Sequence, residues 1–186
     1  MTGFTVAFVC SGNRFRSPLA EHLLRLRLDG RDVQIESLGT LELGSLPPLP
    51  EAQDEGRRRG LDLSDHRSRS LAGADLSGID LVIGFERSHI VTAVIDAAAA
   101  RDRTFTLPEL VGLLDGLAAP DTAAPADRAR ALVRRAAARR PPDPQLLHVP
   151  ELPDPLRRTP EEQRQIAADI EALVERLASS LFGAAR

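Results

Sequence analysis

Residues 9–18 have the sequence VCSGNRFRSP, and this stretch joins two segments of different character. Residues 4–9 are mostly apolar and strand-forming, which predicts a buried central strand. After the stretch, Pro18 suits a first helical turn, and leucines follow it at helical spacing. The stretch is therefore predicted to link the carboxyl end of a buried strand to a helix N-terminus, where backbone N–H groups favour anions.

The residue types in this loop are those that phosphoryl transfer to a thiol needs. Cys10 would face the loop amides and the helix dipole, and both favour a thiolate nucleophile over a thiol. Arg16 is placed to return across the loop and to bind two phosphoryl oxygens. Gly12 and Asn13 tolerate the positive φ angles that let successive amides converge on one anion. The loop is therefore predicted to bind a phosphate group or another oxyanion.

Further along the chain, short apolar runs at residues 33–38, 81–85 and 104–107 predict strands. Segments of helical character lie between them, and residues 160–182 have the pattern of an amphipathic helix. One of these segments, at residues 89–100, is predicted to be a helix capped by Ser88. Alternating strands and helices favour an α/β fold with a parallel sheet between helical layers.

The pattern Val-Cys-x-Gly-Asn-x-x-Arg-Ser-Pro-x-Ala-Glu at residues 9–21 resembles the signature of the low-molecular-weight protein tyrosine phosphatases. The resemblance implies a three-layer fold with a four-stranded parallel sheet in the order 2-1-3-4. It also implies a phosphatase that acts on protein phosphotyrosine, or on a related small phosphorylated molecule, through a phosphocysteine intermediate. Neither a metal nor another cofactor is needed for that reaction.

The resemblance also implies a division of roles among the catalytic residues. Cys10 would attack phosphorus while Arg16 and the amides of residues 11–16 hold the equatorial oxygens. Asp154 stands in a late Asp-Pro pair, where members of the family place their general acid, so it would protonate the leaving group and then activate water. Composition alone would make this Asp-Pro pair a turn before the last helix.

A wider set of residues is expected to support the phosphate site. Ser17 would donate a hydrogen bond to the thiolate. The resemblance implies that Asn13, Ser37 and His66 form a network that holds the loop, although His66 fits a surface histidine equally well. Glu86, after the third strand, could brace the edge of the site or be a solvated carboxylate. The loop residues predicted to bind or support phosphate are Ser11, Gly12, Asn13, Arg14 and Phe15.

Several positions depart from the family pattern. Phe15 replaces a second loop cysteine, so Cys10 has no neighbour for a protective disulfide. Arg14 occupies a position that in the family helps to select the phosphorylated side chain, and its charge would favour acidic substrates if it faces the pocket. The aromatic walls of the family's cleft are replaced by Leu41, Leu43, Leu46 and Leu156. Stacking on a phosphotyrosine ring is therefore not expected from these walls.

Composition limits the other classes of function. A net charge of -3 over 186 residues argues against nonspecific nucleic-acid binding. No apolar run reaches the roughly 18 residues that a membrane helix needs, so we expect no membrane partner and a cytoplasmic location. The single cysteine excludes internal disulfides and a metal site with several thiolates.

We expect one domain over residues 1–186, with an insertion relative to the family at about 118–148. Within it, residues 127–140 predict a helix dense in alanine and arginine, which the prolines of residues 141–144 would end. Its arginines are interpreted as a solvated helical face rather than as contacts for an acidic partner.

Two other functions are compatible with the sequence. An arsenate reductase of the same fold would use Cys10 to attack arsenate, and with one cysteine in the chain it would need an external small thiol. A noncatalytic phospho-binding regulatory protein would keep the anion loop without turnover. Retention of Cys10, Arg16 and Asp154 argues against the second alternative, because binding alone requires neither a nucleophile nor an acid.

Overall fold

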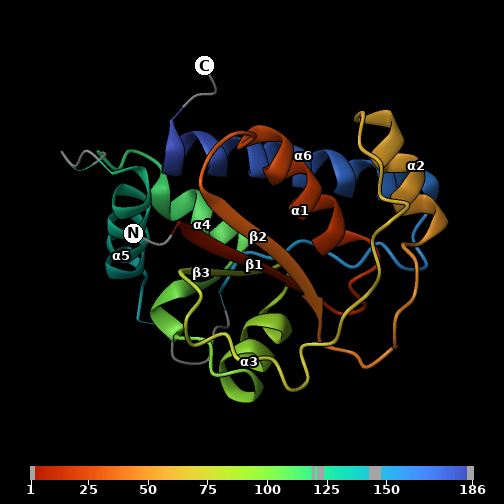
Figure 1. The fold of residues 1–186 in the computed structure, drawn as a ribbon, viewed down its shortest axis with the longest axis horizontal. Helices are drawn as coiled ribbons and strands as arrows, with labels where there is room; N and C mark the ends of the chain where they lie inside the picture. The colour runs from red at the N-terminus through yellow and green to blue at the C-terminus, as the bar shows by residue number, and fades with distance from the viewer. Residues whose placement is uncertain (1–2, 119, 121–123, 143–147, 184–186) are drawn as a thin grey trace.

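The computed structural model describes residues 3–118, 120, 124–142 and 148–183, and these residues form a parallel sheet covered by helices on both faces (Figure 1). The strands within this part are β1 (Phe4–Cys10), β2 (Val33–Gly39), β3 (Leu81–Gly84) and β4 (Thr104–Thr106). They form one four-stranded sheet in the order β2-β1-β3-β4, with every pair parallel. The predicted fold class and strand order are confirmed.

Helices cover the two faces of the sheet unequally, as Figure 1 shows. The helices of the described residues are α1 (Arg16–Arg27), α2 (Pro50–Arg58), α3 (Arg87–Asp96), α4 (Leu107–Leu114), α5 (Pro125–Arg139) and α6 (Pro160–Phe182), with a 3-10 turn η1 at Arg101–Arg103. Side chains of β1 alternate between the faces: Phe4, Val6 and Phe8 join the core beneath α1, α4, α5 and α6. Ala7 and Val9 point to the other face and pack with residues of α3.

The register of the two central strands, β1 and β2, determines where the loop after β1 lies. Cys10 at the end of β1 is paired with Gly39 at the end of β2. Beyond the strands, Thr40 N–H donates to the Cys10 carbonyl and Leu41 N–H donates to the Ser11 carbonyl, both at 2.9 Å. Because both strands end at the same edge, the loop after β1 is supported along its side by the segment after β2.

Helix α3 differs from its predicted limits at both ends. It begins at Arg87 with Glu86 as the N-cap residue, so the prediction that Ser88 caps a helix starting at about residue 89 is wrong. The ring of His89 accepts the Glu86 N–H at 3.1 Å, and this bond is one half of a capping box that Glu86 and His89 form at the start of the helix. At the other end, Ala98 has a φ of 54°, so the alanine run leaves the helix and buries Ala97 and Ala99 instead.

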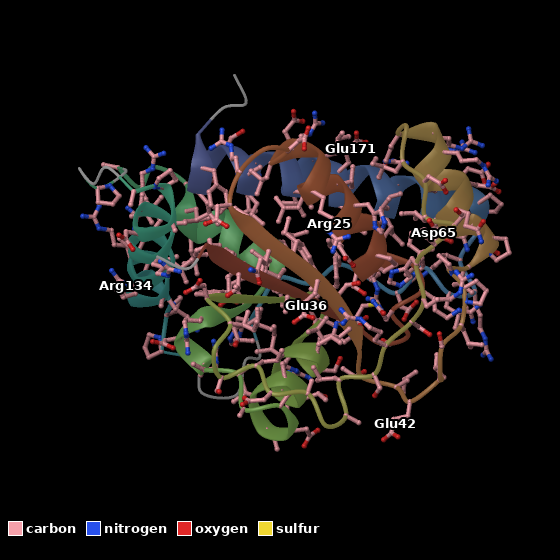
Figure 2. The ribbon with its side chains drawn as sticks, in the orientation of Figure 1. Arg25, Glu36, Glu42, Asp65, Arg134 and Glu171 are labelled. Carbon is pink, nitrogen blue, oxygen red and sulfur yellow. The ribbon has the colours of Figure 1, made fainter. Side chains whose placement is uncertain are left out.

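Helix α5, in the predicted insertion, packs its apolar face on α4 and α6. The expectation of a solvated arginine face is wrong in part, because Arg130 of α5 and the C-cap residue Arg140 are partly buried and bind the rest of the protein. Arg130 donates to both carboxylate oxygens of Asp80 and to the Gly3 carbonyl. Arg140 pairs with Glu109 and lies 4.1 Å from the centre of a phenylalanine ring. Arg134, labelled in Figure 2, is exposed.

The single-domain prediction stays a prediction, and so does the insertion at about 118–148. Within the described residues, side chains of α5 share one hydrophobic core with those of α1, α4 and α6. Residues 119, 121–123 and 143–147 of the predicted insertion lie outside the described residues, and they include Asp143 and Pro144 of the PPDP segment. In the described part of the chain, no helix combines the length and hydrophobicity needed to cross a membrane.

Candidate active site

Cys10 lies at the floor of a pocket at the carboxyl edge of the sheet. Its side chain is 3% exposed, and its Sγ accepts the Asn13 N–H at 3.2 Å. Asn13 reaches this position with a φ of 51°, as predicted, whereas Gly12 keeps a negative or extended φ, so only one residue of the pair uses the left-handed region. The turn thus aims at least one loop amide at the sulfur.

The hydrogen-bond partners of Ser17 determine the direction of its hydroxyl proton. The Asn13 side-chain amide donates to Ser17 Oγ at 2.9 Å and to Ser37 Oγ at 2.8 Å. Ser37 in turn donates to the buried carboxylate of Glu21 at 2.5 Å. Ser17 Oγ also lies 3.0 Å from Cys10 Sγ, and because a thiolate can only accept, the Ser17 hydroxyl is the donor whenever the sulfur is deprotonated. This arrangement stabilises a sulfur anion.

Asn13 is also held from its outer side. Its carbonyl accepts a hydrogen bond from His66 Nε2 at 2.8 Å, and its Oδ1 accepts the backbone N–H of Arg69 at 2.9 Å. Burial lowers the pKa of His66, and the hydrogen bond to the Asn13 carbonyl opposes that shift. The structure therefore brings together Asn13, Ser37 and His66, the three residues expected to form a network.

Gly39 allows the loop to sit close to the end of β2. A Cβ atom at this position would lie 2.9 Å from the Ser11 carbonyl oxygen and 3.1 Å from the Asn13 nitrogen. Both neighbours are backbone atoms that form the anion loop, so they could not give way without changing it. The glycine is therefore part of what shapes the pocket.

Arg16, the first residue of α1, is 2% exposed and joins four parts of the site. Its Nη2 donates to Asp154 Oδ2 at 2.7 Å and to Ser11 Oγ at 3.3 Å. Its Nη1 donates to the Leu152 carbonyl at 3.1 Å and lies 3.3 Å from Glu86 Oε2. These contacts fix the guanidinium plane in the pocket wall, and they show Glu86 as a brace rather than a solvated carboxylate.

Asp154 approaches the loop because the segment before it is anchored to the sheet. Leu152 N–H donates to the Phe85 carbonyl at 2.8 Å, just beyond the end of β3. The Asp154 carboxylate is 42% exposed, and its second oxygen accepts the Leu156 N–H at 2.8 Å. One oxygen thus faces Arg16 while the group stays accessible from solvent, which suits a side chain that exchanges protons.

The mouth of the pocket is aliphatic. A cavity of about 170 Å³ is lined by the loop, Asp154 and three of the predicted wall leucines, Leu41, Leu43 and Leu156. Leu46 does not line it, so that part of the wall prediction is wrong. Arg14 does line the mouth, with its Nε bound to the Pro47 carbonyl at 2.8 Å. Phe15 borders the pocket but is 4% exposed and belongs mainly to the core.

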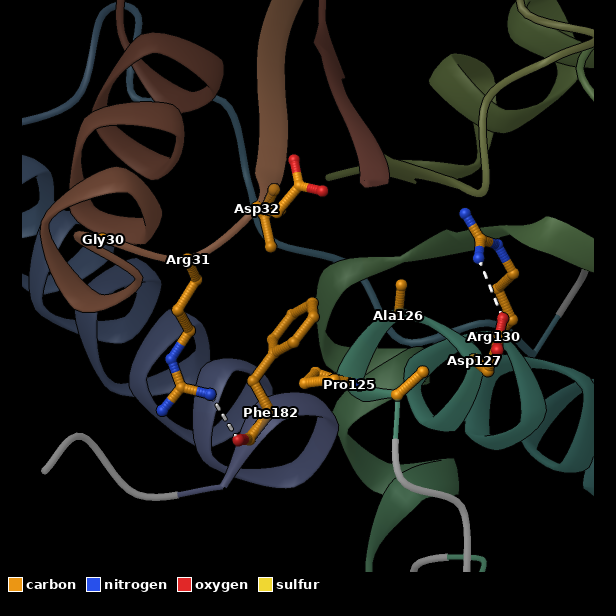
Figure 3. A pocket seen from close by; sticks show the side chains of 10 residues that line it. Gly30, Arg31, Asp32, Pro125, Ala126, Asp127, Arg130 and Phe182 are labelled. Carbon is orange, nitrogen blue, oxygen red and sulfur yellow. Dashed lines mark hydrogen bonds and ion pairs between the residues drawn. The ribbon is translucent and has the colours of Figure 1, made fainter. Parts of the chain in front are cut away.

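A larger cavity of about 400 Å³ lies at the opposite, amino-terminal edge of the sheet (Figure 3). It is bounded by the start of β2, the start of α5 and Phe182 at the end of α6, where Arg31 donates to the Phe182 carbonyl at 2.6 Å. It contains none of the predicted site residues. Nowhere in the described residues are three or more His, Cys, Asp or Glu side chains grouped so that they could hold a metal ion.

Comparison with known proteins agrees with the geometry of the loop. The family model described as low molecular weight phosphotyrosine protein phosphatase matches residues 5–135. The chain belongs to this family. The match includes the strand, the anion loop and the network around Asn13, and it confirms the resemblance seen in the sequence. Asp154 lies beyond the matched region.

Two relatives and one solved structure show what the chain is similar to. The chain is 34% identical over 100 residues to the low molecular weight protein-tyrosine-phosphatase Etp of Escherichia coli K12, a match that spans 54% of this chain and 66% of that relative. It is 30% identical over 114 residues to a protein-arginine-phosphatase of Geobacillus stearothermophilus, spanning 61% of this chain and 75% of the relative. The crystal structure of the family member from T. tengcongensis has a TM-score of 0.70 at 27% identity and covers 96% of this chain and 100% of that one.

Three contributors to the site were missed in the sequence. Glu21 lies one helical turn after Ser17, a spacing that could have placed both on the same side of α1. His89 contacts the loop from α3, and its spacing of three residues from Glu86 was the available signal. No signal in the sequence could have indicated the Leu152 carbonyl. Every residue has a backbone carbonyl, and only the folded chain shows that this one accepts a hydrogen bond from Arg16.

Proposed function

We propose that this protein is a cysteine-dependent phosphatase that hydrolyses phosphorylated substrates through a phosphocysteine intermediate. The observation that carries the proposal is the convergence of Cys10, Arg16 and Asp154 on one pocket, with Ser17 donating toward the sulfur and Arg16 2.7 Å from Asp154. Binding of an anion alone would require neither the nucleophile nor the carboxylate.

In the first step, the Cys10 thiolate attacks phosphorus and the bond from phosphorus to the leaving oxygen breaks. Asp154, protonated, gives its proton to that oxygen, while Arg16 and the loop amides bind the equatorial oxygens. In the second step, ionised Asp154 takes a proton from water, which attacks phosphorus and releases phosphate and the thiolate. Ser17 stabilises the thiolate each time the sulfur carries charge.

The substrate class follows from the family and from the pocket mouth. We propose a phosphorylated protein side chain or a small phosphorylated molecule. The relatives include a protein-tyrosine-phosphatase and a protein-arginine-phosphatase by name. Apart from Phe15, which is buried in the core, the described residues that line the pocket provide no aromatic ring for stacking on phosphotyrosine. The substrate screen should therefore include phosphotyrosine, phosphoarginine and sugar phosphates.

A cytoplasmic location is part of the proposal, because the chain has one cysteine and no second thiol to protect Cys10. Once oxidised, Cys10 would need an external reductant, which reducing compartments supply.

Product release from p-nitrophenyl phosphate tests the proposed function, using wild type, Cys10→Ser and Asp154→Ala. We expect turnover by wild type, no turnover by Cys10→Ser and a reduced rate for Asp154→Ala. Equal rates for wild type and Cys10→Ser would refute a cysteine-dependent mechanism. Turnover of arsenate with a small thiol, together with failure on every phosphate ester, would instead select the arsenate alternative, which the phosphatase names of the relatives do not support.

A further inference from the structure

His89 is an almost fully buried histidine that contacts the anion loop from a different layer of the fold. It lies on α3 with 1% of its side chain exposed, and its Nε2 is 3.0 Å from Ser11 Oγ. Gly84 makes this approach possible, because a Cβ atom there would lie 2.9 Å from the His89 Cβ. Helix α3 is thus seated so that an imidazole reaches the wall of the phosphate pocket.

The hydrogen bonds of His89 determine which ring nitrogen carries its proton. Its Nδ1 accepts the backbone N–H groups of Phe85 at 3.3 Å and Glu86 at 3.1 Å. Burial and then the nearby Arg16 lower the pKa of His89 to about 3, so the ring is neutral near pH 7. A neutral ring whose Nδ1 is an acceptor carries its proton on Nε2, and it therefore donates to Ser11 Oγ.

Ser11 Oγ consequently accepts two hydrogen bonds, one from His89 Nε2 and one from Arg16 Nη2 at 3.3 Å. With both lone pairs engaged, the hydroxyl must act as a donor in its third direction. Among the described residues, the Ser11 hydroxyl makes no hydrogen bond to a further acceptor, and Ser11 lines the cavity that also contains Cys10, Arg16 and Asp154. Its proton is therefore available to an oxyanion that binds in this cavity.

We propose that the Ser11 hydroxyl is a further catalytic donor, which His89 orients so that its proton binds an oxygen of the phosphoryl group. This inference rests on the proposed function, because it assigns an added side-chain donor to the same oxyanion site. Ser11 would add to the loop amides and Arg16, and its donor would already be oriented before substrate binds. His89 is a positioning residue, since it acts through Ser11.

Anion binding measured by titration calorimetry at pH 7 tests the role of Ser11 without requiring turnover. Sulfate is the main probe because at this pH it only accepts hydrogen bonds, whereas inorganic phosphate can also donate them. Ser11→Ala should bind sulfate about tenfold more weakly than wild type, the usual effect of one donor lost to a charged acceptor. Ser11→Thr, which keeps the hydroxyl, should retain most of the affinity.

Ser88→Ala is the matched control, because Ser88 is exposed on the same helix and next to His89 in the sequence. Equal sulfate affinity for Ser11→Ala and Ser88→Ala would overturn the proposal. So would a loss confined to inorganic phosphate, because Ser11 would then be an acceptor. A wild type that binds no sulfate would overturn it as well.

A double-mutant cycle tests whether His89 acts through Ser11. His89→Gln keeps an acceptor for the backbone and a donor for Ser11, so it should bind sulfate better than His89→Leu. In the Ser11→Ala background, His89→Leu should cause little additional loss. If His89→Leu weakens sulfate binding equally in wild type and in Ser11→Ala, His89 does not act through Ser11. If His89→Leu does not fold, the Ser11 variants alone decide.

The same measurements separate this inference from the phosphatase proposal. If wild type turns over p-nitrophenyl phosphate and Ser11→Ala binds sulfate normally, only the inference about Ser11 fails. If Ser11→Ala weakens sulfate binding but wild type is no faster than Cys10→Ser, the Ser11 donor stands for binding and the phosphatase proposal fails.

Discussion

Asp154 Oδ2 lies 2.7 Å from Arg16 Nη2, so the proposed general acid contacts the proposed phosphate-binding guanidinium across 138 residues of sequence. The contact holds the carboxylate at the cavity that also contains Cys10. In the proposed mechanism, Asp154 must exchange this ion pair for a proton before the first chemical step.

Asp154→Ala should lower kcat by about 10²–10⁴ on substrates with poor leaving groups, because an unprotonated alkoxide or phenolate leaves slowly. The loss should shrink as the leaving-group pKa falls. Measuring kcat for a series of aryl phosphates checks this, with a steeper dependence on leaving-group pKa in Asp154→Ala than in wild type. Parallel dependences in the two enzymes would show that Asp154 is not the acid.

Ser17→Ala should slow hydrolysis of the phosphocysteine more than its formation when water attack limits the rate. Ser17 donates to the sulfur that departs as a thiolate in that step. Rapid-quench measurements should show a larger burst of leaving group and a slower steady state, by about tenfold for one lost hydrogen bond to charge. Ser179→Ala, at an exposed position on α6, provides the control. A steady state unchanged by Ser17→Ala would contradict the role of the hydroxyl.

Leu156→Tyr should increase activity on phosphotyrosine by restoring a ring at the pocket mouth. An aromatic pair contributes about 0.5–1.5 kcal/mol, which corresponds to roughly two- to tenfold in kcat/KM. Activity on a sugar phosphate should stay near the wild-type value. An equal change for both substrates would mean that Leu156 affects the acid beside it rather than the substrate ring.

Arg14→Ile should raise the ratio of phosphotyrosine activity to activity on small acidic phosphates, because Arg14 lines the mouth and adds positive charge there. The measurement is kcat/KM for a neutral phosphotyrosine peptide and for an acidic sugar phosphate, compared at two salt concentrations. Screening by salt should reduce the difference between variant and wild type. An unchanged ratio would remove the specificity role of Arg14.

Stability should fall as the pH is lowered from 7 to 5, in part because of His89. Its folded pKa of about 3 lies below the ordinary value of 6.5, so in this window the unfolded chain binds a proton that the folded protein does not. One such group lowers the free energy of unfolding by about 2 kcal/mol over this range. Urea unfolding at both pH values should show a smaller loss for His89→Gln than for wild type. Equal losses in the two proteins would contradict the sign of the shift.

The loop and its sheet could be predicted because their signals are local. Cys10, Asn13, Arg16 and Ser17 lie within eight residues of one another, and a buried strand followed by Pro18 determines how they are presented. The ends of α3 were predicted less well. There, the helix is capped by Glu86 and His89 rather than by Ser88. The Glu86 N–H donates to the buried imidazole of His89, and this contact depends on tertiary packing.

The sequence by itself identified the family and predicted Cys10 as the nucleophile and Arg16 as its phosphate-binding partner, since one short motif places these groups on a strand end and a helix N-terminus. The tertiary structure alone decided that Asp154 meets Arg16, that His89 contacts Ser11 and that Arg130 and Arg140 bind within the protein. These contacts join segments distant in the sequence. No local pattern encodes them, because they depend on how β1, β3 and the segment at Leu152 assemble at one edge of the sheet.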